Sequence, residues 1–151
     1  MSGIIKTIAL RFGDGFAPSG GTIKAHQNII NKLGFVWYGK IGSNISKKAE
    51  IMIFNNIQPR ILLIHSGTPY RYWAYVDALI HKEPPQDEYP SYYQDKSNKI
   101  KVWFRVVKFE KAPSDVMSTA IVMSSKATLG VTSKHSMSPY FMIEYEGDND
   151  K

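Results

Sequence analysis

Short apolar runs, separated by glycine, proline and polar clusters, recur along the chain. Runs of this kind indicate strands. The run at residues 60–65 is continuous rather than alternating, which is typical of a strand buried on both faces. The predicted strands lie at residues 7–12, 35–41, 51–54, 60–65, 71–81, 99–108 and 140–145.

Helical periodicity is clear in residues 22–33, where apolar side chains recur three and four positions apart. Thr22 can cap the start of this helix, and Gly34 stands where a residue in the left-handed conformation is expected to end it. Residues 113–123 fit either a short helix or a further strand. Residues 124–138 are interpreted as a loop with one weak strand, and the prolines of residues 83–90 predict a loop there too.

Many short strands with few helices predict an α+β fold, a curled or closed barrel of about six strands with one or two flanking helices. A chain of 151 residues is long enough to bury a core without a metal or disulfides. No repeat or shift in composition marks a boundary. We therefore expect one domain over residues 1–147 and a tail or linker stub at 148–151.

Two predicted strands have alternating faces. In residues 71–81, Tyr72 and its even-numbered neighbours share one face, and Trp73 shares the other with the odd-numbered residues. In residues 99–108, Trp103 lies between Lys101 and Arg105 on one face. A tryptophan between two cations favours nucleic-acid binding. A barrel exterior with a lysine stem packed over the indole fits the same pattern.

The net charge of +6 favours a polyanionic partner. The absence of cysteine excludes disulfides and thiolate metal sites. The sequence shows neither a signal peptide nor an apolar stretch that could span a membrane, and a cytoplasmic protein is compatible with this composition.

Catalytic and metal chemistry are not visible in the sequence. The four histidines lack the spacing of a zinc site, and neither a carboxylate pair nor a nucleophile elbow is present. We therefore predict no catalytic residue, no metal and no cofactor. The glycine-rich residues 13–21 fit neither a dinucleotide fingerprint nor a P-loop and are interpreted as a connector that can border a ligand. His65 and Ser66 stand at the end of a buried strand. They are either functional side chains exposed there or part of a turn in which the histidine has its hydrogen bonds satisfied.

Residues 34–44 join a helix end, an apolar strand and a polar turn. The strand carries the adjacent aromatics Trp37 and Tyr38, and the turn carries Ser43 and Asn44. Such a turn could close over a small flat ligand. The alternative is that the two aromatics seal an edge of the core.

The order of these features resembles the EVE and YTH domains of the PUA-like superfamily. The resemblance lies in order and spacing over residues 34–113. It rests on Val36-Trp37, Asn44 with Lys47-Lys48, the strand at 60–65 with His65-Ser66, the strand from Trp73 to Ile80, the proline and tyrosine stretch of 84–93, and Lys101-Val102-Trp103-Phe104.

The resemblance implies a reader that holds a modified base, flipped out of its strand, in an aromatic pocket. By position, Trp37 would form one wall beside Tyr38. Tyr92 and Tyr93 stand near the second wall, where the YTH pattern has tryptophan. The other implied pocket residues are Ser43, Asn44, His65, Ser66 and, at lower rank, Trp73; the implied backbone contacts are Lys47, Lys48, Lys101, Trp103 and Arg105.

The resulting hypothesis is a non-enzymatic module that binds a methylated or hydroxymethylated base in DNA or RNA. A restriction or defence protein, with a nuclease or NTPase subunit, is one setting for such a specificity module. One rival is an enzyme related to the ASCH group that acts on a modified nucleoside through a lysine and a polar residue. Another is a protein-interaction module whose aromatics form an exposed patch.

Overall fold

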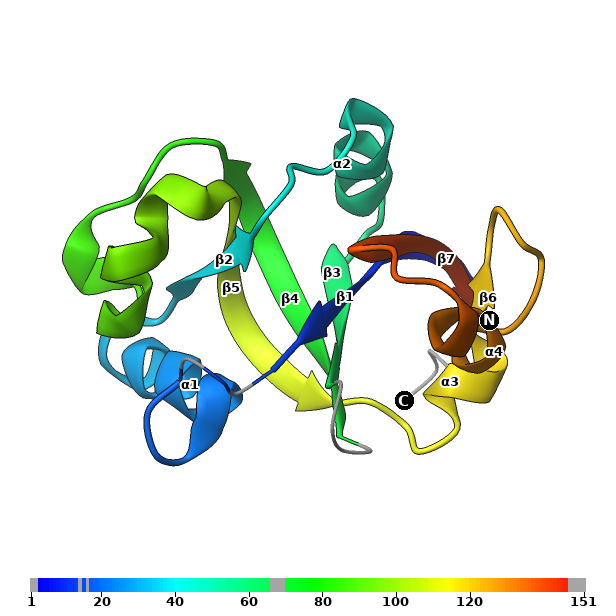
Figure 1. The fold of residues 1–151 in the computed structure, drawn as a ribbon, viewed down its shortest axis with the longest axis horizontal. Helices are drawn as coiled ribbons and strands as arrows, with labels where there is room; N and C mark the ends of the chain where they lie inside the picture. Colours follow the sequence, from blue (N-terminus) through cyan, green and yellow to red (C-terminus); the bar gives the residue numbers. More distant parts are fainter. Residues whose placement is uncertain (1–2, 14, 16, 66–69, 147–151) are drawn as a thin grey trace.

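The computed structural model describes residues 3–13, 15, 17–65 and 70–146. Within these residues seven strands form one sheet in the order β2-β5-β4-β3-β1-β7-β6 (Figure 1). β1 and β3 pair in parallel, and the other pairs are antiparallel. The strands are β1 (Ile4–Phe12), β2 (Val36–Ile41), β3 (Arg60–His65), β4 (Arg71–Ile80), β5 (Ile100–Lys111), β6 (Ile121–Val122) and β7 (Tyr140–Glu146).

The same residues form four α-helices and two 3₁₀ helices, so the predicted α+β fold is confirmed. Figure 1 shows α3 and α4 beside β6 and β7 at one end of the molecule, with α1 at the other. The helices are α1 (Gly21–Leu33), α2 (Lys47–Phe54), α3 (Val116–Thr119), α4 (Leu129–His135), η1 (Gln86–Glu88) and η2 (Ser91–Lys99).

The predicted helix at 22–33 is confirmed, and so is its C-cap. Gly34 has a φ of 86°, and its N–H donates to the Ile30 carbonyl at 2.7 Å. The predicted N-cap is wrong, because Gly20 occupies that position and Thr22 lies inside the first turn. The Thr22 hydroxyl instead donates to the Gly13 carbonyl at 2.8 Å, tying the glycine-rich loop to the helix.

The strand predicted at 51–54 is wrong, since these residues belong to α2. Ser46 caps this helix by accepting a hydrogen bond from the Ala49 N–H at 3.1 Å. Ala49 and Ile53, four residues apart, face the core, whereas Ile51 is exposed. Four consecutive apolar residues indicated a strand, but the cap and the one-sided burial are those of a helix.

Residues 113–138 hold more regular structure than the sequence predicted. Both alternatives left open for 113–123 occur in succession, as α3 and then β6. The loop expected at 124–138 contains α4, whose N-cap Thr128 accepts a hydrogen bond from the Val131 N–H at 3.2 Å. The proline-rich loop likewise includes η1.

β3 is buried on both faces, as its continuous apolar run predicted, and so is the middle of β1. Leu10 on β1 and Leu63 on β3 point into an inner core enclosed by strands β1 to β5 and covered by α1 and α2. Ala9 and Leu62 point the other way, into a second core shared with α3, α4, β6 and β7. The two central strands are thus the common wall of two cores.

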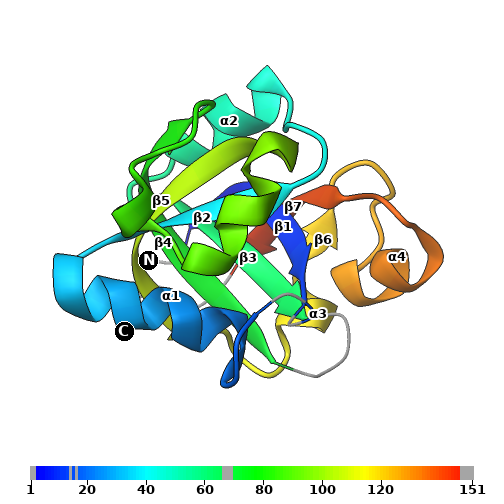
Figure 2. The same cartoon turned by 60° about the vertical axis from the view of Figure 1, so that its left-hand side comes forward.

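A third apolar layer covers the outer face of β2 and β5. It consists of Trp37, Tyr89, Tyr93, Ile100 and Trp103. The tyrosines come from the segment that contains η1 and η2, so this segment is held by aromatic packing. Figure 2 shows η2 lying over β2.

Register shifts in the strand pairing break the alternation predicted for β4 and β5. The pairing shifts around Asp77 on β4, and Leu79 therefore joins Tyr72 in the inner core. On β5 the shift falls at Lys101, so Ile100 packs with Trp103 in the third layer. The expectation that Trp103 stands exposed between two cations is wrong, because the indole is completely buried.

Gly39→Ala should destabilise the fold by about 1–2 kcal/mol, because an added Cβ would meet rigid neighbours. It would lie 3.0 Å from Cζ3 of Trp103 and 2.9 Å from Cδ1 of Ile100. Urea unfolding would measure the change in the free energy of unfolding. Gly3→Ala is the control, because a Cβ there meets nothing. Equal midpoints for the two variants would contradict the close packing on β2.

Candidate functional site

A cavity of about 380 Å³ lies between the end of β1 and the edge strand β2. These two strands are not neighbours in the sheet order, so the curl of the sheet brings them together. A volume of this size suits a small organic ligand. The described lining residues are Leu10, Arg11, Phe12, Gly13, Gly15, Thr22, Tyr38, Gly39, Lys40, Ile41, Tyr92, Tyr93, Met137, Ser138 and Pro139.

Three tyrosines supply the aromatic wall of this cavity. Tyr38 comes from β2, and Tyr92 and Tyr93 come from η2, with the latter two ring centroids 4.8 Å apart. The Tyr93 hydroxyl is hydrogen-bonded to the side chain of Tyr92 and the backbone of Gly39. Burial is the main cause that raises the pKa of Tyr38 and of Tyr93 above the ordinary value. Both rings therefore stay neutral.

His26 on α1 lies behind the tyrosine wall with no exposed surface. Its ring centroid is 5.0 Å from that of Tyr38, 5.4 Å from Tyr93 and 6.5 Å from Tyr92. Nδ1 lies 2.8 Å from the Thr22 carbonyl and therefore carries the proton, while Nε2 has no hydrogen-bond partner among the described residues. Desolvation lowers the pKa of His26 to about 4, so the ring is neutral and orients the wall by packing.

Two cations also line the cavity. Lys40 shares the inward face of β2 with Tyr38, is only 6% exposed, and donates from Nζ to the Ser43 carbonyl at 2.5 Å. Burial lowers the pKa of its ammonium. Arg11 donates from Nη2 to the carbonyls of Ser133 and Ser136, both at 2.7 Å. The cavity thus combines flat aromatic surface with buried donors.

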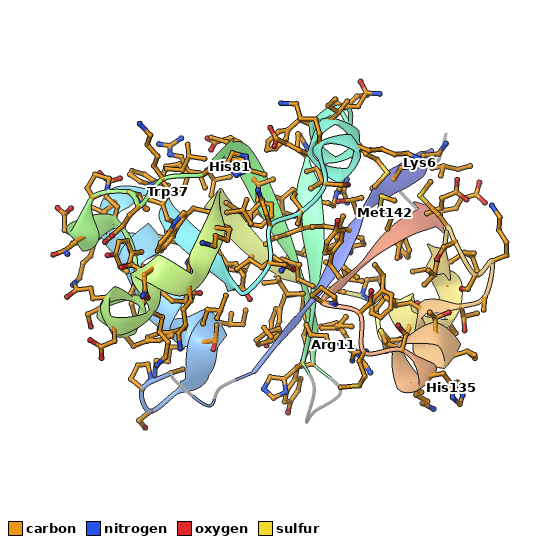
Figure 3. The ribbon with its side chains drawn as sticks, turned by 45° about the horizontal axis from the view of Figure 1, so that its top comes forward. Lys6, Arg11, Trp37, His81, His135 and Met142 are labelled. Atoms are coloured by element: carbon orange, nitrogen blue, oxygen red, sulfur yellow. The ribbon has the colours of Figure 1, made fainter. Side chains whose placement is uncertain are left out.

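Tyr38, Tyr92 and Tyr93 are the predicted pocket residues that the structure brings together. Trp37 points away from the cavity, into the third layer, where its Nε1–H donates to Glu88 Oε1 at 3.0 Å. It therefore anchors the segment that carries Tyr92 and Tyr93. Figure 3 places Trp37 and the cavity residue Arg11 in separate parts of the molecule.

The other predicted pocket residues are dispersed. Ser43 and Asn44 are exposed, and Asn44 Oδ1 accepts a hydrogen bond from the Ile45 N–H at 2.8 Å. His65 lines a smaller neighbouring cavity and lies edge-on to Phe12, with ring centroids 4.9 Å apart. Trp73 is buried against Tyr145 in the second core. Ser66 lies outside the described residues.

The residues predicted to contact the nucleic-acid backbone differ in their exposure and in their neighbours. Lys47 and Lys48 are exposed at the start of α2, and Lys47 lies 3.9 Å from Glu50. Lys101 is exposed at its bulge. Arg105 pairs with Asp77 at 2.7 Å and lies over the ring of Phe35. Trp103 has no surface for such a contact.

Sequence reasoning missed Arg11, Thr22, His26 and Lys40. For Lys40 a signal was present, because strand alternation puts it on the same face as Val36 and Tyr38. Nothing comparable marked His26, whose neighbours arrive from β2 and η2. The connector expected to border a ligand does so, since Gly13 and Gly15 line the cavity.

The described residues contain no group of three or more histidine, aspartate or glutamate side chains placed to hold a metal. No helix among them is long and apolar enough to cross a membrane.

Stability should fall as the pH drops from about 6.5 to about 4, because the unfolded chain binds a proton at His26 more readily than the folded chain. The loss is roughly 2–4 kcal/mol. Urea midpoints measured across this range would show it, and His26→Gln should flatten this part of the profile. His135→Gln, at an exposed histidine, should leave it unchanged. A His26→Gln profile as steep as the parent's would contradict the buried neutral ring.

The fold and the cavity can be compared with known proteins. The model of the Pua-like family matches residues 8–139. No curated protein and no solved structure matches the chain. The family match supports a PUA-like, nucleic-acid-binding type of fold, while the finer resemblance to EVE and YTH domains remains a prediction. Because the match covers most of the 151 residues, the chain belongs to the Pua-like family.

Proposed function

We propose that this chain is a nucleic-acid-binding module that takes one modified base, extruded from its strand, into the cavity between β1 and β2. The observation that carries the proposal is the cavity of about 380 Å³ walled by Tyr38, Tyr92 and Tyr93. A flat base gains from stacking on aromatic faces, and a few polar groups beside it read its edge. The family match supports a binding role.

The aromatic cage in this proposal differs from the one that the resemblance implied. Tyr92 and Tyr93 keep their role as walls, and Tyr38 takes the place assigned to Trp37. Trp37 acts from behind, because its hydrogen bond to Glu88 fixes the segment that carries η2. A base that enters the cavity would meet Tyr92 first, because Tyr92 is the more exposed of the two η2 rings.

Phosphate contacts are proposed for exposed cations near the loop after β2. Lys47 and Lys48 begin α2 directly after this loop, which also accepts the Lys40 hydrogen bond at Ser43. The overall charge of +6 supports attraction of a polyanion. Arg105 contributes less, since Asp77 and Phe35 already engage its guanidinium.

A specific observation also favours a second candidate, an enzyme that acts on a modified nucleoside. Lys40 is a buried amine with a lowered pKa beside a cavity, which is the setting of lysines used as bases or nucleophiles. Incubating the protein with modified nucleosides and following product by chromatography tests this candidate. Turnover by the parent protein that is lost in Lys40→Arg would favour the enzyme over the binding module.

Tyr92→Ala should weaken binding of the preferred modified oligonucleotide by about tenfold or more, because one stacking face is lost. Fluorescence anisotropy with labelled short oligonucleotides, unmodified and carrying methylated or hydroxymethylated bases, measures the change. Tyr75→Ala on β4 is the matched control, since this tyrosine packs against the second core and does not line the cavity. If Tyr92→Ala keeps the parent's preference for the modified oligonucleotide, the assignment of this cavity as the base pocket is contradicted.

Lys48→Glu should weaken binding to modified and unmodified oligonucleotides alike, because phosphate contacts carry no sequence information. The slope of log affinity against log salt should fall by about one or slightly more. Lys108→Glu is the control, because Lys108 belongs to the C-terminal part of β5. Figure 1 shows this end of the strand away from α2. An unchanged salt slope in Lys48→Glu would remove α2 from the interface.

A further inference from the structure

We infer that the group recognised in the cavity is an anionic or strongly accepting substituent, best met by a carboxyl-bearing base, with Lys40 as the residue that selects it. This inference rests on the proposed function and names the ligand class of the same cavity.

The first support is the position of Lys40. Its side chain lies among apolar residues on the inward face of β2, with 6% of its surface exposed. The ammonium donates one hydrogen bond, to the Ser43 carbonyl, and lies 5.8 Å from the centroid of the Tyr140 ring. It forms no ion pair with a carboxylate in the part of the chain that the structure describes.

A buried ammonium without a counter-ion is costly, and an anion supplied by a ligand would offset that cost. An ammonium has three N–H donors, of which the Ser43 carbonyl takes one. A carboxylate at the Lys40 end of the cavity would therefore find a desolvated cation with donor capacity to spare. Charge-assisted hydrogen bonds of this kind are stronger than those between neutral groups.

Arg11 is the second cation beside the cavity. Its Nη2 is committed to two backbone carbonyls, and its guanidinium lies 5.4 Å from the centroid of the Phe141 ring. Its Nε–H is buried without a partner among the described residues. Arg11 lines the same cavity as Lys40. The guanidinium is thus directed towards α4 and Phe141, and Arg11 contributes positive charge at the border of the cavity.

The remaining described lining residues do not balance these two cations. They include no aspartate and no glutamate. Tyr38 and Tyr93 stay neutral because burial raises their pKa values, and His26 behind them is neutral as well. A bare methyl group would gain only apolar contact in this cavity, whereas a carboxylate would also meet the positive charge.

The test compares four oligonucleotides of one sequence, in DNA and in RNA, that differ at a single cytosine. That cytosine is unmodified or carries a 5-methyl, 5-hydroxymethyl or 5-carboxyl group. Fluorescence anisotropy should show that the carboxyl form binds at least about tenfold more tightly than the methyl form. Lys40→Met, which keeps the apolar stem, should abolish this difference, and Lys40→Arg should restore much of it.

Lys48→Met is the matched control, because it removes an exposed lysine and should lower all affinities equally while keeping their order. Thermal melting checks that each variant is folded. If the carboxyl form binds no better than the methyl form, or if folded Lys40→Met keeps the difference, the inference is overturned. Selective, Tyr92-dependent binding of the methyl or hydroxymethyl form alone would leave the proposed function standing, whereas equal binding of all four forms would overturn both.

Discussion

The burial of β1 and β3 on both faces is the constraint on which the rest of the structure depends. Inward side chains such as Leu10 and Leu63 build the inner core, and outward ones such as Leu62 build the second core under α3 and α4. A sheet held from both sides in its middle must curl around the inner core to cover it. That curl brings the edge strand β2 towards β1 and leaves the cavity between them.

The third apolar layer gives the cavity its aromatic wall. Trp103 lies against Gly39 on β2, and its ring contacts those of Tyr89 and Tyr93, with centroids 4.8 and 5.7 Å away. Because this packing fixes η2 from outside and His26 on α1 supports the tyrosines from behind, the wall is assembled before any ligand arrives. Preorganisation of this kind lowers the ordering cost of binding. Trp37 and Trp103 therefore support the site, and Tyr38, Tyr92 and Tyr93 form its surface.

The sequence could predict most strands, the long helix and the Pua-like fold, because these follow from local periodicity and from the order of elements. It failed at 51–54, where four apolar residues suggested a strand although Ser46 was available as a helix cap. The burial of Trp103 could not be predicted either, since Tyr89 and Tyr93, which cover it, come from the segment that contains η1 and η2. Tyr92 and Tyr93 were found through the resemblance. His26 and Arg11 were missed because their partners come from distant parts of the chain.

The central claim is that the tyrosine-lined cavity receives a base. The most direct measurement is the NMR spectrum of the protein with ¹³C-labelled aromatic rings, recorded while an oligonucleotide carrying one modified base is added. The account predicts that the ring signals of Tyr38, Tyr92 and Tyr93 shift together and saturate, whereas those of Trp73 and Tyr145 in the second core stay in place. Saturable binding that shifts rings of the second core and leaves the three cavity tyrosines unchanged would contradict it.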